Sequence, residues 1–243
     1  MQEMNDNQII EYAMSDARKR KKAYAKSVVD HLMGEAQPVS VFMAGSPGAG
    51  KTETARSMCQ VFKQQAGANF IHIDNDEIRK EFAHYNGLNS PLFQTAATIF
   101  VEAVHDRALR RKVSFIMDST LASIDKAKSN IMRSLDKNRF VLIIFVYQSP
   151  EQAWELVQAR EVVEGRRVPP GVFIHQFIES QVTVDLLKQE FSDQVELMFV
   201  EKNTDTGQEA IYLDVTNIDA LISKKYTRSQ LETIVGLADM AEK

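Results

Sequence analysis

Residues 45 to 52 of this chain read Gly45-Ser46-Pro47-Gly48-Ala49-Gly50-Lys51-Thr52. The octet matches the pattern G-x-x-x-x-G-K-[ST], follows the apolar run 39–44 and leads into a stretch compatible with a helix. Its glycines let backbone N–H groups turn inward toward phosphates, and the start of the helix adds the positive end of its dipole. We expect Lys51 to reach the β- and γ-phosphates of ATP or GTP and the Thr52 hydroxyl to bind Mg²⁺. The octet as a whole is therefore the predicted nucleotide-binding loop.

Length and composition favour one large domain with appendages. The chain has 243 residues, of which 44% are hydrophobic and 26% are charged, and these values exclude a disordered, collagen-like or coiled-coil protein. No apolar run approaches the length of a membrane span, and the first residues lack the basic and apolar parts of an export signal. The single Cys59 excludes an intramolecular disulfide. We therefore expect a cytoplasmic protein without a membrane segment.

Further apolar runs recur along the chain and leave room for helices between them. The four main runs are 39–44, 70–73, 113–117 and 140–147. Two later runs, 195–200 and 210–213, would add strands or an edge hairpin, because residues 203–207 between them have the composition of a turn. The alternation predicts an α/β fold of the P-loop NTPase type, in which a parallel sheet carries helices on both faces.

Both ends of the chain are expected to be helical appendages. Residues 7–34 carry apolar side chains spaced four apart and are closed by Gly34 and Pro38, which predicts a helix ahead of the first strand. Roughly the last thirty residues predict an amphipathic helical tail. We therefore divide the chain into an N-terminal helical extension, 1–37, and a P-loop domain, 38–243.

Two carboxylates follow the second apolar run, Asp74 and Asp76. In sheets of this type ligands bind at the carboxyl ends of the strands. Phosphoryl transfer to a hydroxyl needs a carboxylate that orients the acceptor oxygen and takes its proton, so Asp76 is the candidate base. In the alternative interpretation, Asp74 or Asp76 only caps the helix that follows.

A third carboxylate, Asp118, closes the apolar run 113–117. An aspartate at this place matches a Walker B strand, whose carboxylate supports Mg²⁺, but it would also suit contact with the acceptor substrate. Both roles stay open. Glu102 lies on the predicted helix before this strand, where it is either a substrate contact or an ordinary solvated glutamate.

An arginine cluster occurs where a predicted helix breaks into a loop. Arg160 lies near the end of a helix that begins with the capping residues 149–152, and Arg166 and Arg167 follow in the Gly- and Pro-containing stretch 165–170. Guanidinium groups match phosphate oxygens and offset the charge that develops in transfer, so the cluster predicts a mobile lid near residues 160–170. A surface cluster without function is the alternative.

These motifs occur in one order along the chain: the octet, Ile73-Asp74-Asn75-Asp76 with Arg79 and His84-Tyr85, Asp118-Ser119-Thr120-Leu121, and Arg160 with Arg167-Val168-Pro169. Over about residues 39–190, the order and spacing of these motifs resemble those of the zeta toxin family of P-loop kinases. The resemblance implies ATP and Mg²⁺ as cofactors. Members that act as toxins phosphorylate the 3′-hydroxyl of the amino sugar in UDP-N-acetylglucosamine, and an antitoxin normally blocks their nucleotide site.

The resemblance also implies roles for individual residues. Asp76 would be the catalytic base, Lys51 and Thr52 would bind the phosphates and Mg²⁺, and the lid arginines would clamp the transferring phosphoryl group. The implied contacts to the sugar nucleotide come from Asp74, Arg79, Glu102, Asp118 and Thr120. Two departures bear on the acceptor side. The family usually has Glu-Gly-Thr where this chain has Asp118-Ser119-Thr120, and a His-Pro pair is common where it has His84-Tyr85.

Two other functions compete with this interpretation. In a polynucleotide 5′-hydroxyl kinase, the basic runs 18–22 and 107–112 would follow a phosphate backbone, although the net charge of −4 makes a nucleic-acid partner unexpected. A non-catalytic nucleotide-binding regulator would have no need of a base such as Asp76. As a further hypothesis, the helix in 1–37 inhibits the site in cis by lying over it, in the manner of an antitoxin.

The histidines show no metal-ligand spacing. We expect scattered structural or surface roles for His31, His72, His84, His105 and His175.

Overall fold

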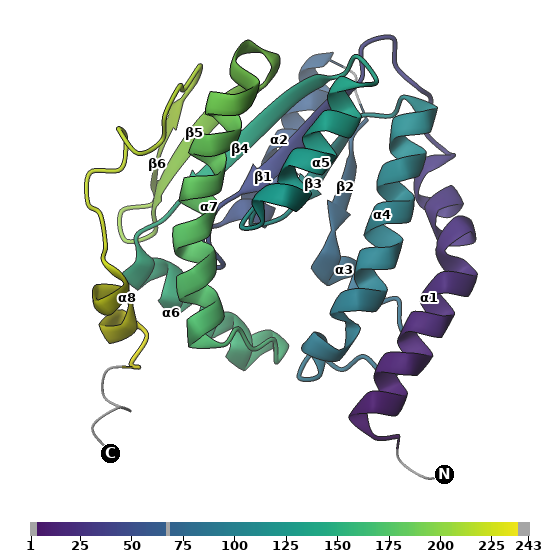
Figure 1. Cartoon of the computed structure of the whole chain (residues 1–243), viewed down its shortest axis with the longest axis horizontal. Helices are drawn as coiled ribbons and strands as arrows, with labels where there is room; N and C mark the ends of the chain where they lie inside the picture. The colour runs from purple at the N-terminus through teal and green to yellow at the C-terminus, as the bar shows by residue number, and fades with distance from the viewer. Residues whose placement is uncertain (1–3, 67–68, 238–243) are drawn as a thin grey trace.

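A computed structural model describes residues 4–66 and 69–237 of the chain, and its centre is a six-stranded sheet (Figure 1). The strands lie in the order β2-β3-β1-β4-β5-β6. Their bounds are β1 Val39–Ala44, β2 Ile71–Asp74, β3 Phe115–Asp118, β4 Phe140–Tyr147, β5 Glu196–Asn203 and β6 Gln208–Tyr212. β1 to β5 are parallel, and β6 pairs antiparallel with β5 in the predicted edge hairpin. The predicted P-loop type of α/β fold is confirmed.

Helices cover both faces of this sheet. They are α1 Asp6–Val29, α2 Lys51–Ala66, α3 Asn75–Arg79, α4 Gln94–Arg111, α5 Ile124–Leu135, α6 Pro150–Glu164, α7 Pro170–Phe191 and α8 Arg228–Ile234, with short 3₁₀ turns at Ser90–Phe93 and Ser192–Gln194. Side chains alternate between the two faces. Val41 and Met43 face α2, whereas Phe42 belongs to the larger core formed with α4, α5 and α7. No helix within the described residues is long and apolar enough to cross a membrane.

α1 begins and ends slightly earlier than expected and packs against the domain. Asn5 caps its first turn in a capping box with Gln8. Its buried side chains are Ala13, Ala17, Ala25 and Val29. Figure 1 shows α1 alongside α4, and the ring of Tyr24 stacks on Phe100 with the ring centroids 4.3 Å apart. α1 therefore shares the main core, while the division of the chain at residues 37 and 38 stays a prediction.

The C-terminal tail is less helical than expected. The only helix in the described part of the tail is α8, whereas residues 213–227 form no helix or strand. This segment is fixed in an irregular path, because the Asp185 carboxylate accepts backbone N–H groups from Ile218 at 2.7 Å and Asp219 at 3.2 Å. Backbone groups held in this way are not available for helical hydrogen bonds. The expected helix therefore shortens to about two turns, and its last predicted residues, 238–243, lie outside the described part.

His105 on α4 is buried in this core as a neutral imidazole. Its side chain has 0% exposure, both ring nitrogens lack hydrogen-bond partners, and its ring lies edge-on to Phe115. Burial lowers the pKa of His105 to about 3, with the positive charges of Arg133 and Arg139 adding to the effect. Below pH 6.5 the unfolded chain therefore gains a proton that the folded protein does not bind, and stability falls as the pH falls.

We expect His105→Leu to reduce this acid sensitivity. Between pH 7 and pH 5 the free energy of unfolding should fall by about 2 kcal/mol less in the variant, which corresponds to about 1.4 kcal/mol per pH unit below the unfolded pKa. Urea unfolding at the two pH values measures the difference. The variant His31→Leu replaces an exposed histidine and serves as control. Its free energy of unfolding should depend on pH as that of the unsubstituted protein does. Equal pH dependence in His105→Leu and the unsubstituted protein would contradict the assignment.

Candidate active site

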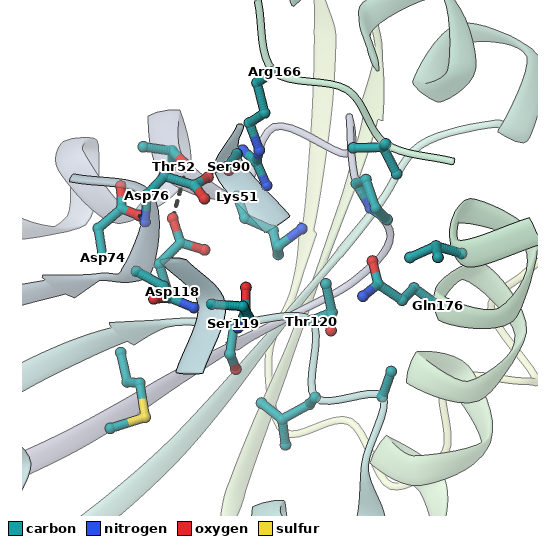
Figure 2. Close-up of a pocket in the computed structure, with 18 of the residues that line it drawn as sticks. Lys51, Thr52, Asp74, Asp76, Ser90, Asp118, Ser119, Thr120, Arg166 and Gln176 are labelled. Carbon is teal, nitrogen blue, oxygen red and sulfur yellow. Dashed lines mark hydrogen bonds and ion pairs between the residues drawn. The ribbon is translucent and has the colours of Figure 1, made fainter. Parts of the chain in front are cut away.

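A pocket of about 630 Å³ opens at the carboxyl ends of β1, β2 and β3. The loop 45–50 follows β1, Asp74 is the last residue of β2, and Asp118 is the last residue of β3. The parallel register pairs Asp74 with Asp118, so the two carboxylates start from neighbouring strand ends. Figure 2 shows the side chains of Lys51, Asp118 and Arg166 converging on this space. The pocket is where the fold class predicts a ligand.

The phosphate loop has the expected geometry. Gly45, Gly48 and Gly50 all have positive φ angles, and a Cβ atom at Gly48 would lie 2.0 Å from the backbone oxygen of Ala153. Only glycine fits this conformation and this close approach. α2 begins at Lys51, so the N-terminus of the helix faces the loop.

Most of the octet lines the pocket. The lining residues are Pro47, Gly48, Gly50, Lys51 and Thr52. Gly45, Ser46 and Ala49 are buried and do not line the pocket. The Lys51 ammonium donates to the Ser46 carbonyl at 2.7 Å.

A negatively charged ligand would stabilise the charged form of Lys51. Burial lowers the pKa of Lys51 to about 8, the nearby Asp118 opposes this effect, and Arg166 adds to it. A phosphate beside this ammonium would supply the missing negative charge.

Thr52 and Asp118 are joined directly. The Thr52 hydroxyl donates to Asp118 Oδ2 at 2.7 Å, and this bond ties the start of α2 to the end of β3. Burial by itself would raise the pKa of Asp118, but the His72 imidazole, the Lys51 ammonium and the Thr52 hydroxyl outweigh burial and hold the pKa below its usual range. Asp118 is therefore an ionised, oxygen-donating group at neutral pH.

The neighbouring Asp74 has the capping role that the sequence left open. Its Oδ1 accepts the backbone N–H of Asp76 at 2.8 Å and so starts α3. Burial raises the pKa of Asp74, and the negative charges of Asp118 and Asp76 raise it further. Asp76 is left without a capping bond of its own and points toward the pocket (Figure 2).

Asp76 lies between two arginines. Arg79 Nη1 is 2.9 Å from Asp76 Oδ1, and Arg166 forms an ion pair with Asp76 Oδ2. The guanidinium of Arg79 is buried and also donates to Ser90 Oγ at 2.8 Å and to Gln94. These bonds fix Arg79, and through it they orient Asp76.

The predicted arginine segment borders the same pocket. α6 ends at Glu164 and is followed by Gly165 in the left-handed conformation, and α7 begins at Pro170. Arg166 and Arg167 therefore lie on a short connection between two helices. Arg160, Arg166 and Arg167 all line the pocket. Arg167 is largely exposed, and its nearest carboxylate is Glu161 at 3.8 Å, which leaves its guanidinium available to a ligand.

Several pocket residues were not found from the sequence. They are Phe42, Ser90, Gln94, Val101, Met117, Ser119, Leu121, Lys126, Asn130 and Gln176. They make the half of the pocket away from the phosphate loop partly apolar and partly amide-lined. They come from several separate elements, and only Ser119 and Leu121 belong to a quoted motif, so no pattern in the sequence identified them as a set. Thr120 lies among them, as expected.

Glu102 is not among the residues that line this pocket, and its contact with the substrate stays a prediction. Its carboxylate pairs with Arg133 at 3.1 Å and with Lys126 at 3.9 Å, and it lines a separate hollow between α1 and α4. Tyr85 also lies away from the pocket, where its ring packs edge-on against Phe93 at 5.5 Å between centroids. Of the two departures from the family pattern, only the one at Ser119 therefore changes the pocket wall.

One expectation about the surroundings of the pocket, that the N-terminal helix lies over the nucleotide site, is wrong. None of the described residues of α1 lines the pocket, because the apolar face of α1 is buried against α4, so α1 does not cover the nucleotide site in cis. His72 lies beside the pocket, because the fold brings its ring 3.7 Å from Asp118 Oδ2. The strand alternation of His72 and Asp74 placed both on one face, which is a signal that the sequence did contain.

The basic runs make contacts within the chain. Arg20 pairs with Asp16 and lies over the rings of Phe82 and Phe100, and Arg107 pairs with Asp30. These contacts use part of the charge that a polynucleotide would need.

A model of the zeta toxin family matches residues 11–213. The chain belongs to the zeta toxin family. Its members are kinases that phosphorylate hydroxyl groups, so this chain is a phosphotransferase with an alcohol acceptor. No match is found among the curated proteins.

Solved structures share the fold of this zeta toxin. One is from the PezAT chromosomal toxin–antitoxin system of Streptococcus pneumoniae, with a TM-score of 0.66, 15% identity and coverage of 96% of each chain. Another is the AvrRxo1-ORF1:ORF2 complex with ATP, with a TM-score of 0.60, 16% identity and coverage of 91% of this chain and 74% of the other. At these identities the likeness concerns the fold.

The pKa of Lys51 predicts how nucleotide affinity depends on pH. A triphosphate binds the charged ammonium, so above about pH 8 binding must take up a proton. We expect the affinity for a non-hydrolysable ATP analogue to fall up to about tenfold per pH unit above that value. Calorimetric titration between pH 7 and 9.5, in two buffers of different ionisation enthalpy, measures affinity and proton uptake together.

Two variants control this experiment. Lys51→Met should bind weakly and without this pH dependence, and the exposed Lys63→Met on the same helix should behave as the unsubstituted protein. An affinity that stays constant up to pH 9.5 would show that Lys51 keeps its proton without the nucleotide.

Proposed function

We propose that this zeta toxin transfers the γ-phosphoryl group of ATP, or of GTP, to a hydroxyl of a sugar nucleotide. The observation that carries the proposal is the convergence of the phosphate loop, Asp118 and Asp76 on one pocket, with the arginine segment at its border. The similar AvrRxo1-ORF1:ORF2 structure was obtained with ATP, which supports a nucleotide in this kind of fold. A pure nucleotide-binding regulator would have no use for Asp76 in this place.

The residues present fit a divalent cation. Two oxygen donors, the Thr52 hydroxyl and the ionised Asp118 carboxylate, lie 2.7 Å apart beside the phosphate loop. Mg²⁺ bound there would neutralise charge on the β- and γ-phosphate oxygens. Asp118 thus has the geometry of the Walker B role, and Asp74, Arg79 and Thr120 remain the proposed contacts to the acceptor.

The chain's own residues provide orientation and proton transfer. Lys51 and the loop N–H groups hold the phosphates, and Arg160, Arg166 and Arg167 offset the charge that develops on the transferred group. Asp76 accepts the proton of the acceptor hydroxyl as the oxygen–phosphorus bond forms and the bond to the ADP oxygen breaks. Because Arg166 pairs with Asp76 in this structure, the phosphates must draw Arg166 away before Asp76 can act as base.

UDP-N-acetylglucosamine is the proposed acceptor. The family assignment supports it, and so does the pocket half beyond the phosphate loop, where Asn130 and Gln176 offer amides and Phe42, Met117 and Leu121 offer apolar surface. Ser119 stands where the family usually has glycine, so a related sugar nucleotide would also suit the altered wall. We further propose an antitoxin protein as partner, because the similar Streptococcus pneumoniae structure belongs to a toxin–antitoxin system.

Asp76→Asn tests the base directly. We expect the variant to lose about a hundred- to ten-thousand-fold in transfer rate, the range for a positioned general base. It should bind ATP at least as tightly as the unsubstituted protein, because Arg166 no longer has to leave an ion pair at position 76. The exposed Asp193→Asn serves as control and should keep full activity. If Asp76→Asn transferred phosphate at nearly the normal rate, Asp76 would serve only to hold Arg79 and Arg166.

The acceptor is identified in the same assay. Labelled ATP is offered with UDP-N-acetylglucosamine and, separately, with a 5′-hydroxyl oligonucleotide. Label on the sugar nucleotide that disappears with Asp76→Asn supports the proposal. Label on the oligonucleotide would instead identify a polynucleotide kinase, and label on neither, with ATP still bound, would assign a different acceptor to the pocket wall around Ser119.

A further inference from the structure

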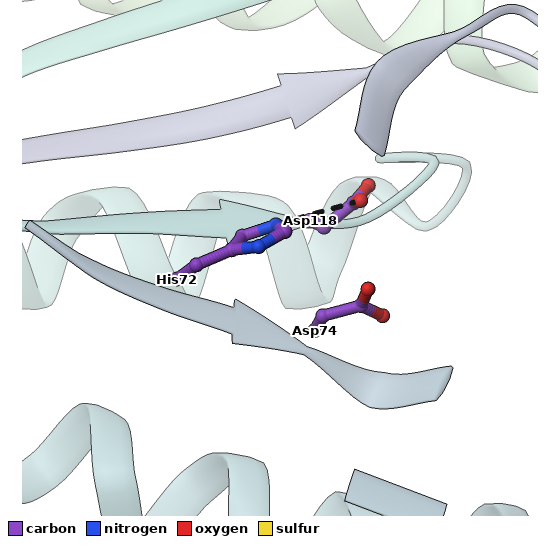
Figure 3. Close-up of side chains that lie close together, drawn as sticks. All are labelled: His72, Asp74 and Asp118. Atoms are coloured by element: carbon purple, nitrogen blue, oxygen red, sulfur yellow. Dashed lines mark ion pairs between the residues drawn. The ribbon is translucent and has the colours of Figure 1, made fainter. Parts of the chain in front are cut away.

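His72, Asp74 and Asp118 form a cluster at the ends of β2 and β3 (Figure 3). One nitrogen or oxygen atom from each residue lies within 4.8 Å of the others. His72 and Asp74 are two residues apart on one strand and therefore face the same side, and Asp118 is the register partner of Asp74 on the next strand. The Thr52 hydroxyl borders the cluster through its bond to Asp118.

The ring nitrogen Nε2 of His72 has no hydrogen-bond partner although it is buried. Its distance of 3.7 Å to Asp118 Oδ2 is too long for a hydrogen bond. A buried nitrogen left unpaired is costly, so the arrangement calls for a group between the two atoms. A cation between a nitrogen lone pair and a carboxylate oxygen would satisfy both.

The spacing also fits shared coordination. Metal ions bind imidazole nitrogen and carboxylate oxygen at about 2.0–2.2 Å, so two ligands of one ion lie about 3 Å apart at a right angle and about 4.2 Å apart on opposite sides. The observed 3.7 Å falls between these values. The Thr52 oxygen, 2.7 Å from Asp118 Oδ2, lies close enough to join the same ion after giving up its hydrogen bond.

We propose that His72 Nε2 is a direct ligand of the cation held by Thr52 and Asp118, and that the site consequently favours a divalent transition-metal ion over Mg²⁺. Mg²⁺ prefers oxygen ligands in strict octahedral geometry, whereas imidazole is a common ligand of transition metals. Mn²⁺ accepts both kinds of donor and is the probe of choice. The inference concerns the metal of the kinase site proposed above, but it is tested without nucleotide or acceptor.

The experiment uses the full chain and Mn²⁺ alone. Electron paramagnetic resonance measures how much Mn²⁺ is bound, and electron spin echo modulation detects a directly coordinated ¹⁴N nucleus. We expect one bound Mn²⁺ with nitrogen modulation in the unsubstituted protein. His72→Gln should lose the modulation and bind Mn²⁺ at least about tenfold more weakly, since changes even to the hydrogen-bond partners of metal ligands cost 10- to 100-fold. Competition by Mg²⁺ should become more effective in that variant.

The exposed His31→Gln is the matched control and should bind Mn²⁺ as the unsubstituted protein does, and thermal unfolding verifies that each variant is folded. Bound Mn²⁺ without nitrogen modulation in the unsubstituted protein would overturn the proposal. This measurement does not depend on any variant. No Mn²⁺ binding, or equal binding by His72→Gln, would overturn it as well. A failed kinase assay with intact Mn²⁺ coordination would refute the proposed function alone.

Discussion

The hydrogen bond between the Thr52 hydroxyl and the Asp118 carboxylate joins the two elements on which the site depends, helix α2 and strand β3. Thr52 belongs to the first turn of α2, and Asp118 ends β3, whose neighbours in the sheet are β1 and β2. The bond exists only because parallel pairing brings the end of β3 level with the loop after β1. The same pairing sets Asp74 opposite Asp118 and so aims α3, with Asp76, at the pocket. Strand register therefore determines the catalytic geometry.

Charge balance is the second constraint on the pocket. Lys51, Arg79, Arg160, Arg166 and Arg167 face a smaller number of carboxylates there. Arg79 is fixed by buried hydrogen bonds, whereas Arg166 lies on a loop between two helices and pairs with Asp76. The excess of positive charge suits a triphosphate, and the loop position of Arg166 allows it to exchange Asp76 for phosphate oxygens. In the proposed mechanism, nucleotide binding would therefore be coupled to release of the base through this one side chain.

The phosphate half of the site could be predicted from the sequence because it is local. The octet, the residues after each strand and the arginines after α6 are short segments whose chemistry is set by their own neighbours along the chain. The position of Glu102 could not be predicted, because it depends on how α4 and α5 pack, and its carboxylate pairs with Arg133 on α5. Asn130 and Gln176 were missed for the same reason, since only tertiary packing brings α5 and α7 to one wall.

The two halves of the pocket are therefore under different constraints. A substitution in the phosphate loop or at Asp118 disturbs strand register, the start of α2 and charge balance together. Each of these residues contributes to more than one of these three features. The acceptor wall is built of side chains from separate strands, loops and helices, such as Phe42, Ser119 and Gln176, and these can change one at a time. Ser119 directly follows β3, stands where the family usually has glycine, and donates its hydroxyl to the Met43 carbonyl at 3.0 Å. A fold of this kind can keep its phosphoryl chemistry while its acceptor varies.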